Sequence, residues 1–249
     1  MSCTWNRIDR MFRVLLAAIA WAAGSAVFAS PQEIVFIAPS NHTMPFVDIQ
    51  RDKLMGGILM DVGEAIAARL NRTARFLVLP SKRIVPALNS AQADGLCYVA
   101  PGWIDGDYNW TKPIFHNQSE VIARLDQPKI VSLSELENVP VGTIFTYHYP
   151  DFEEILGSRL KRIDAMSMEL NLRMLEARRM DFAIVEQITL DYLKKTNRWT
   201  DLHEVYRGPR YGAMCAFSKK SSIPFQEVQD AINKLEQDGT MAEILARYR

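Results

Sequence analysis

The first hundred residues alternate between short apolar runs and amphipathic stretches, and this alternation limits the possible folds more than any other feature of the sequence. The predicted strands are residues 33–38, 74–79 and 96–99, and the predicted helices are residues 61–70 and 81–90. We expect Asp61 to be the N-cap of the first helix, with Glu64 completing a capping box. A β-α-β-α-β order predicts a parallel sheet with helices on its faces, which is an α/β fold.

A second series of the same kind follows residue 124. Its predicted strands are residues 139–145, 160–163, 181–185 and 202–206, and its predicted helices are residues 131–137, 151–156, 166–178 and 186–195. A strand at 211–217 and helices at 223–235 and 241–248 complete the chain. Two α/β lobes in tandem, each of a usual domain size, are therefore expected.

The segment that links the two series is rich in aromatic and acidic residues. Trp103, Asp105, Asp107, Tyr108 and Trp110 all follow the predicted strand at 96–99, and a further extended run covers residues 120–124. Loops at the carboxyl ends of sheet strands are where α/β proteins bind ligands. The alternative is that the two tryptophans only pack this loop onto its own lobe.

The N-terminus has the pattern of an export signal. Three arginines precede an apolar run at residues 14–23, and Val-Phe-Ala at 27–29 allows cleavage between Ala29 and Ser30. The run is too short for a membrane-spanning helix with these flanks. We therefore predict a cleavable signal peptide at residues 1–29 and a periplasmic location.

Composition and motifs give no indication of other classes of function. The formal net charge is +0, so nothing suggests a nucleic-acid or anionic-membrane partner. The four histidines lack metal-ligand spacing, and the sequence contains no G-x-S-x-G, P-loop or dinucleotide motif. We predict no metal and no cofactor.

Several short segments, none specific alone, occur in an informative order. They are Met-Pro-Phe at 44–46, Gly-Ile-Leu-Met-Asp-Val at 57–62, Val-Pro-Ala-Leu at 85–88, Val-Gly at 141–142, Ala-Arg-Arg-Met-Asp-Phe-Ala-Ile-Val at 177–185, Tyr-Gly at 211–212 and the closing stretch 235–248. Together they resemble the periplasmic solute-binding proteins of family 3, the Venus-flytrap receptors of polar amino-acid ABC transporters. The resemblance implies a two-lobe, type II periplasmic-binding-protein fold with two hinge strands, near residues 121–124 and 211–217. Lobe 1 would comprise residues 30–122 and 216–249, and lobe 2 residues 123–215.

The resemblance also implies a function. The protein would bind a small polar solute in the cleft between its lobes, as a monomer and without catalysis, and deliver it to an ABC-type importer through an inner-membrane permease. One alternative is a ligand-sensing or accessory protein for a membrane kinase or dehydrogenase. Another is a periplasmic dehydratase-type enzyme in which a carboxylate such as Glu186 acts as an acid.

The binding residues depart from the family pattern at three places. Residues 100–108 lack the arginine that clamps the ligand carboxylate in amino-acid-binding members. Glu186 stands where those members carry an aspartate for the ligand ammonium, and Thr146 replaces a glycine. Specificity for amino acids therefore does not carry over, and the ligand stays open.

Eight residues are predicted to bind the ligand: Phe46, Lys82, Arg83, Tyr98, Trp103, Thr146, Tyr147 and Glu186. Phe46 would stack on the ligand, Lys82 and Arg83 would bind an anion at a helix N-terminus, and Glu186 would bind a cationic group. The alternatives are a core position for Phe46, a solvated first turn for Lys82 and Arg83, and an ordinary first-turn carboxylate for Glu186.

Cys97 and Cys215 are the cysteines that remain after signal cleavage. In the fold that the resemblance implies, the returning strand inserts antiparallel beside the third strand, where opposed residues lie within disulfide range. The expected compartment is oxidising. We predict a disulfide between these cysteines; the alternative is two buried thiols on opposite faces of the sheet.

Overall fold

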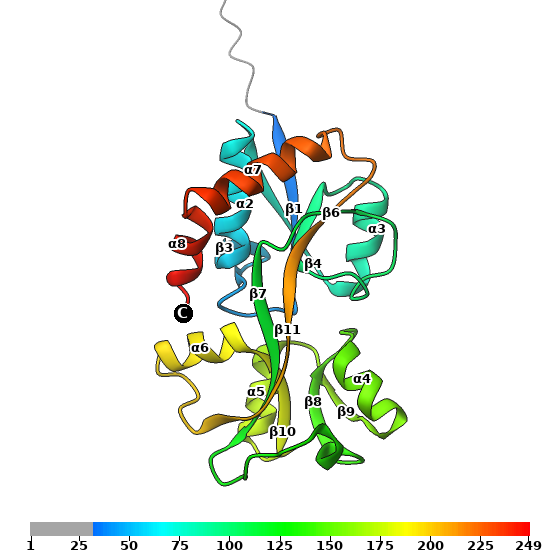
Figure 1. Ribbon diagram of the computed structural model, residues 1–249, viewed down its shortest axis with the longest axis vertical. Helices are drawn as coiled ribbons and strands as arrows, with labels where there is room; N and C mark the ends of the chain where they lie inside the picture. The colour runs from blue at the N-terminus through cyan, green and yellow to red at the C-terminus, as the bar shows by residue number, and fades with distance from the viewer. Residues whose placement is uncertain (1–31) are drawn as a thin grey trace, which may run out of the picture. The chain divides into compact units, whose positions relative to one another are not determined.

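The structure is a computed structural model and describes residues 32–249. Residues 33–249 form one compact unit, and the predicted signal peptide lies outside the described residues. Within this unit two lobes share one continuous sheet, in which the strand order is β4-β1-β5-β11-β7-β10-β8-β9 (Figure 1). Below, lobe 1 means the elements that surround β4, β1 and β5, and lobe 2 means those that surround β10, β8 and β9.

Lobe 1 confirms the predicted parallel β-α-β-α-β unit. Its strands are β1 (Glu33–Pro39), β4 (Thr73–Leu79) and β5 (Gly95–Val99), and its helical elements are α2 (Ile58–Arg69), η1 (Ser81–Arg83), α3 (Ile84–Asn89), α7 (Phe225–Gln237) and α8 (Thr240–Ala246). Strand β1 is parallel to both β4 and β5. Two elements were not predicted: a hairpin of β2 (Asp48–Gln50) with β3 (Lys53–Gly56), and the short β6 (Asn109–Trp110).

Lobe 2 repeats the parallel arrangement. Its strands are β8 (Pro140–Ile144), β9 (Lys161–Ala165) and β10 (Phe182–Glu186), and its helical elements are η2 (Leu133–Leu136), α4 (Pro150–Leu156), η3 (Gly157–Arg159), α5 (Met168–Glu176) and α6 (Gln187–Lys195). Strand β8 is parallel to both β9 and β10. The segment predicted as a helix at 131–137 contains the short 3₁₀ helix η2.

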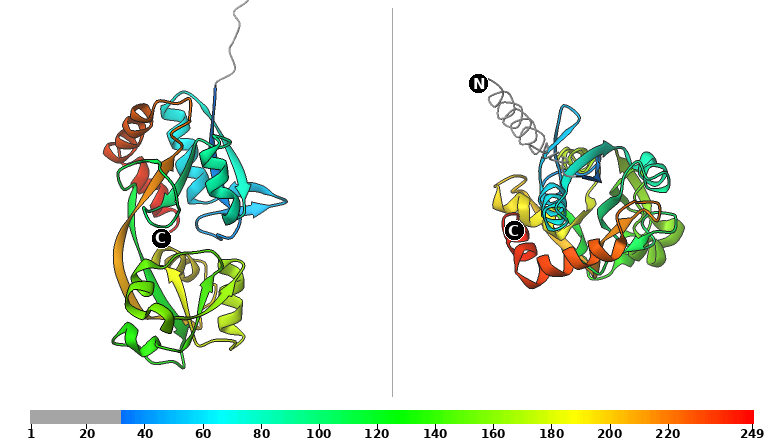
Figure 2. Two further views of the ribbon diagram at one scale, coloured as in Figure 1. Left: turned by 90° about the vertical axis from the view of Figure 1, so that its right-hand side faces the viewer. Right: turned by 90° about the horizontal axis from the view of Figure 1, so that it is seen from above.

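Two long strands connect the lobes (Figures 1 and 2). β7 (Phe115–Arg124) and β11 (Leu202–Phe217) pair antiparallel along their length, and each also pairs with strands of a lobe: β11 with β5, and β7 with β10. The stretches 202–206 and 211–217, predicted as separate strands, form this single strand of 16 residues. The two-lobe fold with two connecting strands is thus confirmed.

The start of α2 differs from the prediction. The helix begins at Ile58 with Gly57 as N-cap, where φ is 106°, a backbone conformation that glycine adopts without steric cost. Asp61 therefore lies inside the first turn, and the predicted capping box is wrong. Its carboxylate instead accepts a hydrogen bond from the Tyr248 hydroxyl at 2.7 Å and pairs with Arg247 at 3.2 Å, which ties the C-terminal residues to α2.

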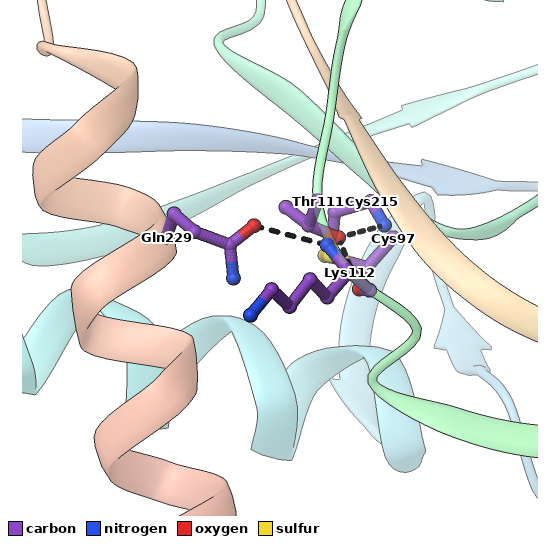
Figure 3. Close-up of a disulfide and its surroundings, with 5 residues drawn as sticks. All are labelled: Cys97, Thr111, Lys112, Cys215 and Gln229. Carbon is purple, nitrogen blue, oxygen red and sulfur yellow. Dashed lines mark hydrogen bonds between the residues drawn. A yellow bond between two sulfur atoms is a disulfide. The ribbon is translucent and has the colours of Figure 1, made fainter.

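The predicted disulfide is present (Figure 3). Cys97 and Cys215 are direct partners in the antiparallel β5–β11 pair and are bonded through their sulfurs. Beside them the Thr111 hydroxyl accepts a hydrogen bond from the Cys215 N–H at 2.9 Å, and the Lys112 N–H donates to the Gln229 side chain of α7 at 2.9 Å. The bond therefore fixes the end of β11 inside lobe 1.

Within residues 32–249 no helix has the length and apolar character needed to cross a membrane.

Removing the disulfide should destabilise the protein without changing its fold. The bond closes a loop across a sequence separation of 118 residues. A loop of this length favours a large effect, and the Cys97→Ala/Cys215→Ala variant should lose about 2–4 kcal/mol of unfolding free energy. Denaturant unfolding measures this, with reduced wild type as the control that should match the variant. Two freely alkylated cysteines in the unreduced native protein would show that the bond does not form.

Candidate functional site

A cavity lies between the lobes, at the carboxyl ends of strands from both. It contains about 980 Å³ of empty space, part of which is open to solvent. Its lobe 1 wall comes from the residues that follow β1 and β5 and from η1 and α3, and its lobe 2 wall from the residues that follow β8 and the end of β10. Parallel strands in each lobe bring these loops to the same edge, which is why they meet in one cavity.

Six of the eight predicted residues line this cavity: Lys82, Tyr98, Trp103, Thr146, Tyr147 and Glu186. The other two do not. Phe46 is buried in lobe 1 and stacks on the Tyr98 ring, with 3.9 Å between ring centroids, so it lies behind the cavity wall. Arg83 is exposed next to Lys82 but is outside the lining.

The sequence reasoning missed several lining residues. They include His42, Ser81, Asp105, Ser119, His148 and Tyr149. Tyr149 could have been found, because it follows Thr146 and Tyr147 in the same loop. His42 follows β1, and its position after a strand was the available signal; in the structure it contacts Phe46 and Tyr98 of its own lobe as well as Tyr147.

Tyr98 reaches the cavity through a β-bulge. The pairing of β5 with β11 matches Cys97 to Cys215 and Val99 to Met214, which leaves Tyr98 as an extra residue on β5. Its φ is 60°, in the left-handed region that residues other than glycine rarely adopt. A bulge of this kind turns one side chain out of the strand's alternation, and strained backbone gathers at functional sites.

A network of hydroxyls and amides holds the aromatic side chains. The hydroxyls of Tyr98 and Tyr211 are 2.8 Å apart, and the Asn117 side-chain amide donates to Tyr98 at 2.9 Å. The Asn117 carbonyl oxygen accepts from the backbone N–H of Ile188, at the start of α6, at 3.3 Å. Asn117, on connecting strand β7, therefore contacts groups of both lobes.

A second contact joins the lobes directly across the cavity. The Tyr147 hydroxyl is 2.8 Å from Nε2 of His42. Burial lowers the pKa of His42 to about 4, so this imidazole is neutral at pH 7. Nearby, the Lys82 ammonium lies 5.1 Å from the centroid of the Phe145 ring, a cation–π contact between residues of different lobes.

Glu186 is the buried acid of the site. It ends β10 and is the N-cap of α6, and only 8 % of it is exposed. In residues 32–249 no Lys, Arg or His forms an ion pair with its carboxylate, and the group that acts to lower its pKa is its own backbone N–H. Burial raises its pKa from 4.5 to about 7.

Tyrosines surround this carboxylate. Burial, and after it the charge of Glu186, raises the pKa of Tyr147, Tyr149 and Tyr211. Burial, the neighbouring Tyr211 and the Glu186 charge raise the pKa of Tyr98 as well. All four phenols are therefore protonated at neutral pH. The site combines a carboxylate that forms no ion pair within the described part of the chain and a largely aromatic wall.

The part of the chain that the structure describes contains no group of three or more His, Cys, Asp or Glu residues placed to hold a metal ion.

The comparisons with known proteins agree with this architecture. The family model of the bacterial extracellular solute-binding proteins, family 3, matches residues 35–249. The chain belongs to this family. The resemblance inferred from the sequence is thereby confirmed. No curated protein shows a significant sequence match to the chain.

Solved structures share the fold of this family 3 solute-binding protein at low sequence identity. An ancestral arginine-binding protein bound to arginine is 19 % identical with a TM-score of 0.72, over 87 % of this chain and 97 % of that one. A histidine kinase sensor domain similar to periplasmic binding proteins is 21 % identical with a TM-score of 0.73, over 88 % and 96 %. An ancestral amino-acid-binding protein, a precursor of cyclohexadienyl dehydratase, is 15 % identical with a TM-score of 0.72, over 87 % and 95 %.

Replacing Glu186 should change how the stability of the ligand-free solute-binding protein depends on pH. Between pH 4.5 and about 7 the folded protein keeps a proton that the unfolded chain has lost. The unfolding free energy therefore falls as pH rises through this window, and Glu186→Gln removes that fall. His42, whose pKa is lowered, acts in the opposite direction in both proteins.

Relative to wild type, the unfolding free energy of Glu186→Gln should rise by about 2 kcal/mol when the pH is raised from 5 to 8. Denaturant unfolding at both values measures the gain. Glu64→Gln, at an exposed position on α2, is the matched control and should follow wild type. Parallel pH profiles for wild type and Glu186→Gln would contradict the burial of an ionisable Glu186.

Thr146 should be replaceable by glycine with a gain in stability. Its φ is 71°, a conformation that is costly for a β-branched residue and free of steric cost for glycine. Glycine loses more conformational entropy on folding, which offsets part of the relieved strain. The net effect of Thr146→Gly should be a gain of about 0.5–1 kcal/mol in unfolding free energy. Thr73→Gly, in β4, removes the same atoms and should lose stability. A loss at both positions would contradict the strained backbone at Thr146.

Proposed function

We propose that this protein is an exported, periplasmic receptor that holds a small polar solute in the cleft between its lobes and delivers it to an ABC-type importer. Membership of family 3 supports binding of a solute. The observation that carries the proposal is the cavity itself, which is walled by both lobes and contains a buried carboxylate without a partner among the described residues. A cleaved signal peptide at residues 1–29, a monomeric state, the absence of catalysis and an inner-membrane permease as partner are parts of this proposal.

We assign ligand contact to Lys82, Tyr98, Trp103, Thr146, Tyr147 and Glu186, all of which line the cavity. Phe46 has a supporting role, because it stacks behind Tyr98. Arg83 receives no ligand contact, since it is exposed and outside the lining. His42 and Tyr149 are added to the proposed site from the geometry.

We place the hinge where the connecting strands leave one core for the other. Phe115 packs in the core of lobe 1 and Val121 in that of lobe 2, so β7 crosses at residues 116–119. The facing part of β11 has a shift in register between Arg207 and Arg210. The resemblance implied hinges near residues 121–124 and 211–217, and the positions that we propose precede both along the chain.

Contacts between the lobes describe the closed state. Besides the His42–Tyr147 bond, the Met168 N–H donates to the Asn41 carbonyl at 3.2 Å. The Lys195 ammonium of α6 donates to the carbonyls of Arg247 and Arg249 at 3.0 Å, beyond the end of α8. Opening the cleft would break these bonds. A ligand that contacts both walls would add further contacts that stabilise the closed state.

A sensing role is the second candidate. Its specific support is the histidine kinase sensor domain of similar fold. Deleting the gene tests the two roles: loss of uptake of the ligand supports delivery to an importer, whereas intact uptake with loss of a ligand-dependent transcriptional response supports sensing. A dehydratase-type reaction with Glu186 as acid is a third candidate, because a carboxyl with a pKa of about 7 can donate a proton near neutral pH. Conversion of the bound ligand would show it.

Ligand binding should close the lobes. Small-angle scattering of the mature protein should give a smaller radius of gyration once a ligand from a thermal-shift screen is added, because closure moves the lobes together about the hinge. A radius of gyration that does not change with a saturating ligand would contradict closure.

Tyr147→Phe removes the bond to His42 and should weaken binding about fivefold, which corresponds to about 1 kcal/mol for one net hydrogen bond.

A further inference from the structure

We infer that the ligand is an organic ammonium ion without an α-carboxylate, seated on Glu186 against the aromatic side chains of Trp103 and Tyr147. This inference rests on the proposed binding function and names the chemical class of its ligand. It follows from three properties of the cavity: its charges, the state of its buried acid and the chemistry of its walls.

The charges of the cavity favour a cation. Apart from three tyrosines that stay protonated at neutral pH, its ionisable lining residues are the acids Glu186 and Asp105, the base Lys82 and two histidines. Lys82 is exposed and its ammonium lies over the Phe145 ring. Within residues 32–249 no arginine lines the cavity, so the fork of donors that binds a carboxylate with two hydrogen bonds is missing.

The buried acid requires a partner that residues 32–249 do not supply. A buried charge is normally paired, because removing an ion from water is costly. Glu186 is more than nine-tenths buried and lines the cavity, yet no described cation lies within ion-pair distance. An ammonium ion from the ligand would complete the pair. It would also restore the charged state of the carboxylate, whose proton leaves as the cation enters.

The walls offer aromatic surface more than free polar groups. The hydroxyls of three lining tyrosines already have protein partners: Tyr98 bonds Tyr211, Tyr147 bonds His42, and Tyr149 accepts the Ile144 N–H at 2.9 Å. Trp103 and Tyr147 therefore supply the ring surface for a ligand, because Phe46 already stacks on the Tyr98 ring and the Arg162 guanidinium lies 5.3 Å from the Tyr149 ring centroid. Rings of Tyr and Trp around a cation stabilise it through cation–π attraction, most strongly where water is excluded.

The decisive experiment compares amines with their parent amino acids. Calorimetry of the mature protein would measure agmatine against arginine, cadaverine against lysine and tyramine against tyrosine; within each pair the molecules differ by the α-carboxylate alone. We expect at least one amine to bind, and to bind at least tenfold more tightly than its parent. Amino acids that bind as tightly as or more tightly than their amines would overturn the inference, as would a failure of every amine to bind.

Two variants test the contacts. Glu186→Gln should fold and should weaken binding of the amine at least tenfold, whereas the exposed control Glu64→Gln should leave it unchanged. Trp103→Leu should weaken binding more than Trp103→Phe, because phenylalanine keeps an aromatic face. Amine binding that neither Glu186→Gln nor Trp103→Leu weakens would overturn the assignment of the site.

The test separates this inference from the proposed function. If a sugar or an organic acid closes the lobes while no amine binds, the receptor function stands and the ammonium inference fails. If no compound of a broad screen of amines, amino acids, sugars and organic acids binds or closes the lobes, both fail.

Discussion

The antiparallel pairing of β7 with β11 is the constraint on which the rest of the structure depends. These strands form the middle of the shared sheet, so one ladder of backbone hydrogen bonds runs through both lobes. The disulfide at Cys215 holds one end of β11 to β5, and pairing of β7 with β10 holds the other side to lobe 2. Since the lobes of residues 32–249 are connected by these two strands, bending of this ladder changes the cleft while each core stays intact.

The chemistry of the site follows from that arrangement. Parallel strands in each lobe direct their carboxyl ends to the cleft, and this places Glu186, at the end of β10, opposite the aromatic residues that follow β5. The bulge at Tyr98 then turns its side chain out of the alternation of the strand and into the cavity wall that Glu186 also lines. Glu186 is buried without an ion-pair partner among residues 32–249, and burial of an unpaired acid costs free energy. A cationic ligand that pairs with the Glu186 carboxylate would remove this cost.

The sequence predicted the parts that local patterns determine. Most strands and helices lie where helical and strand periodicity placed them, whereas the β2–β3 hairpin, β6 and the continuity of β11 were missed. The disulfide was predicted from the fold that the resemblance implied, in which Cys97 and Cys215 oppose each other. Other features depend on distant partners. The bulge at Tyr98 is defined by its register with β11, and His42 forms its hydrogen bond with Tyr147, 105 residues away. Phe46 was expected at the ligand because its loop is irregular, yet the neighbouring Tyr98 ring covers it.

The ionisation of Glu186 tests the central claim most directly. A site-specific ¹³C NMR titration of its side-chain carboxyl would measure the pKa in the ligand-free protein and again with a saturating amine. The account predicts a pKa near 7 without ligand, and a fall of at least one unit when the cation binds, which corresponds to at least about 1.4 kcal/mol of favourable interaction with the charged carboxylate. A pKa near the ordinary value of 4.5 in the empty protein, unchanged by the amine, would contradict it.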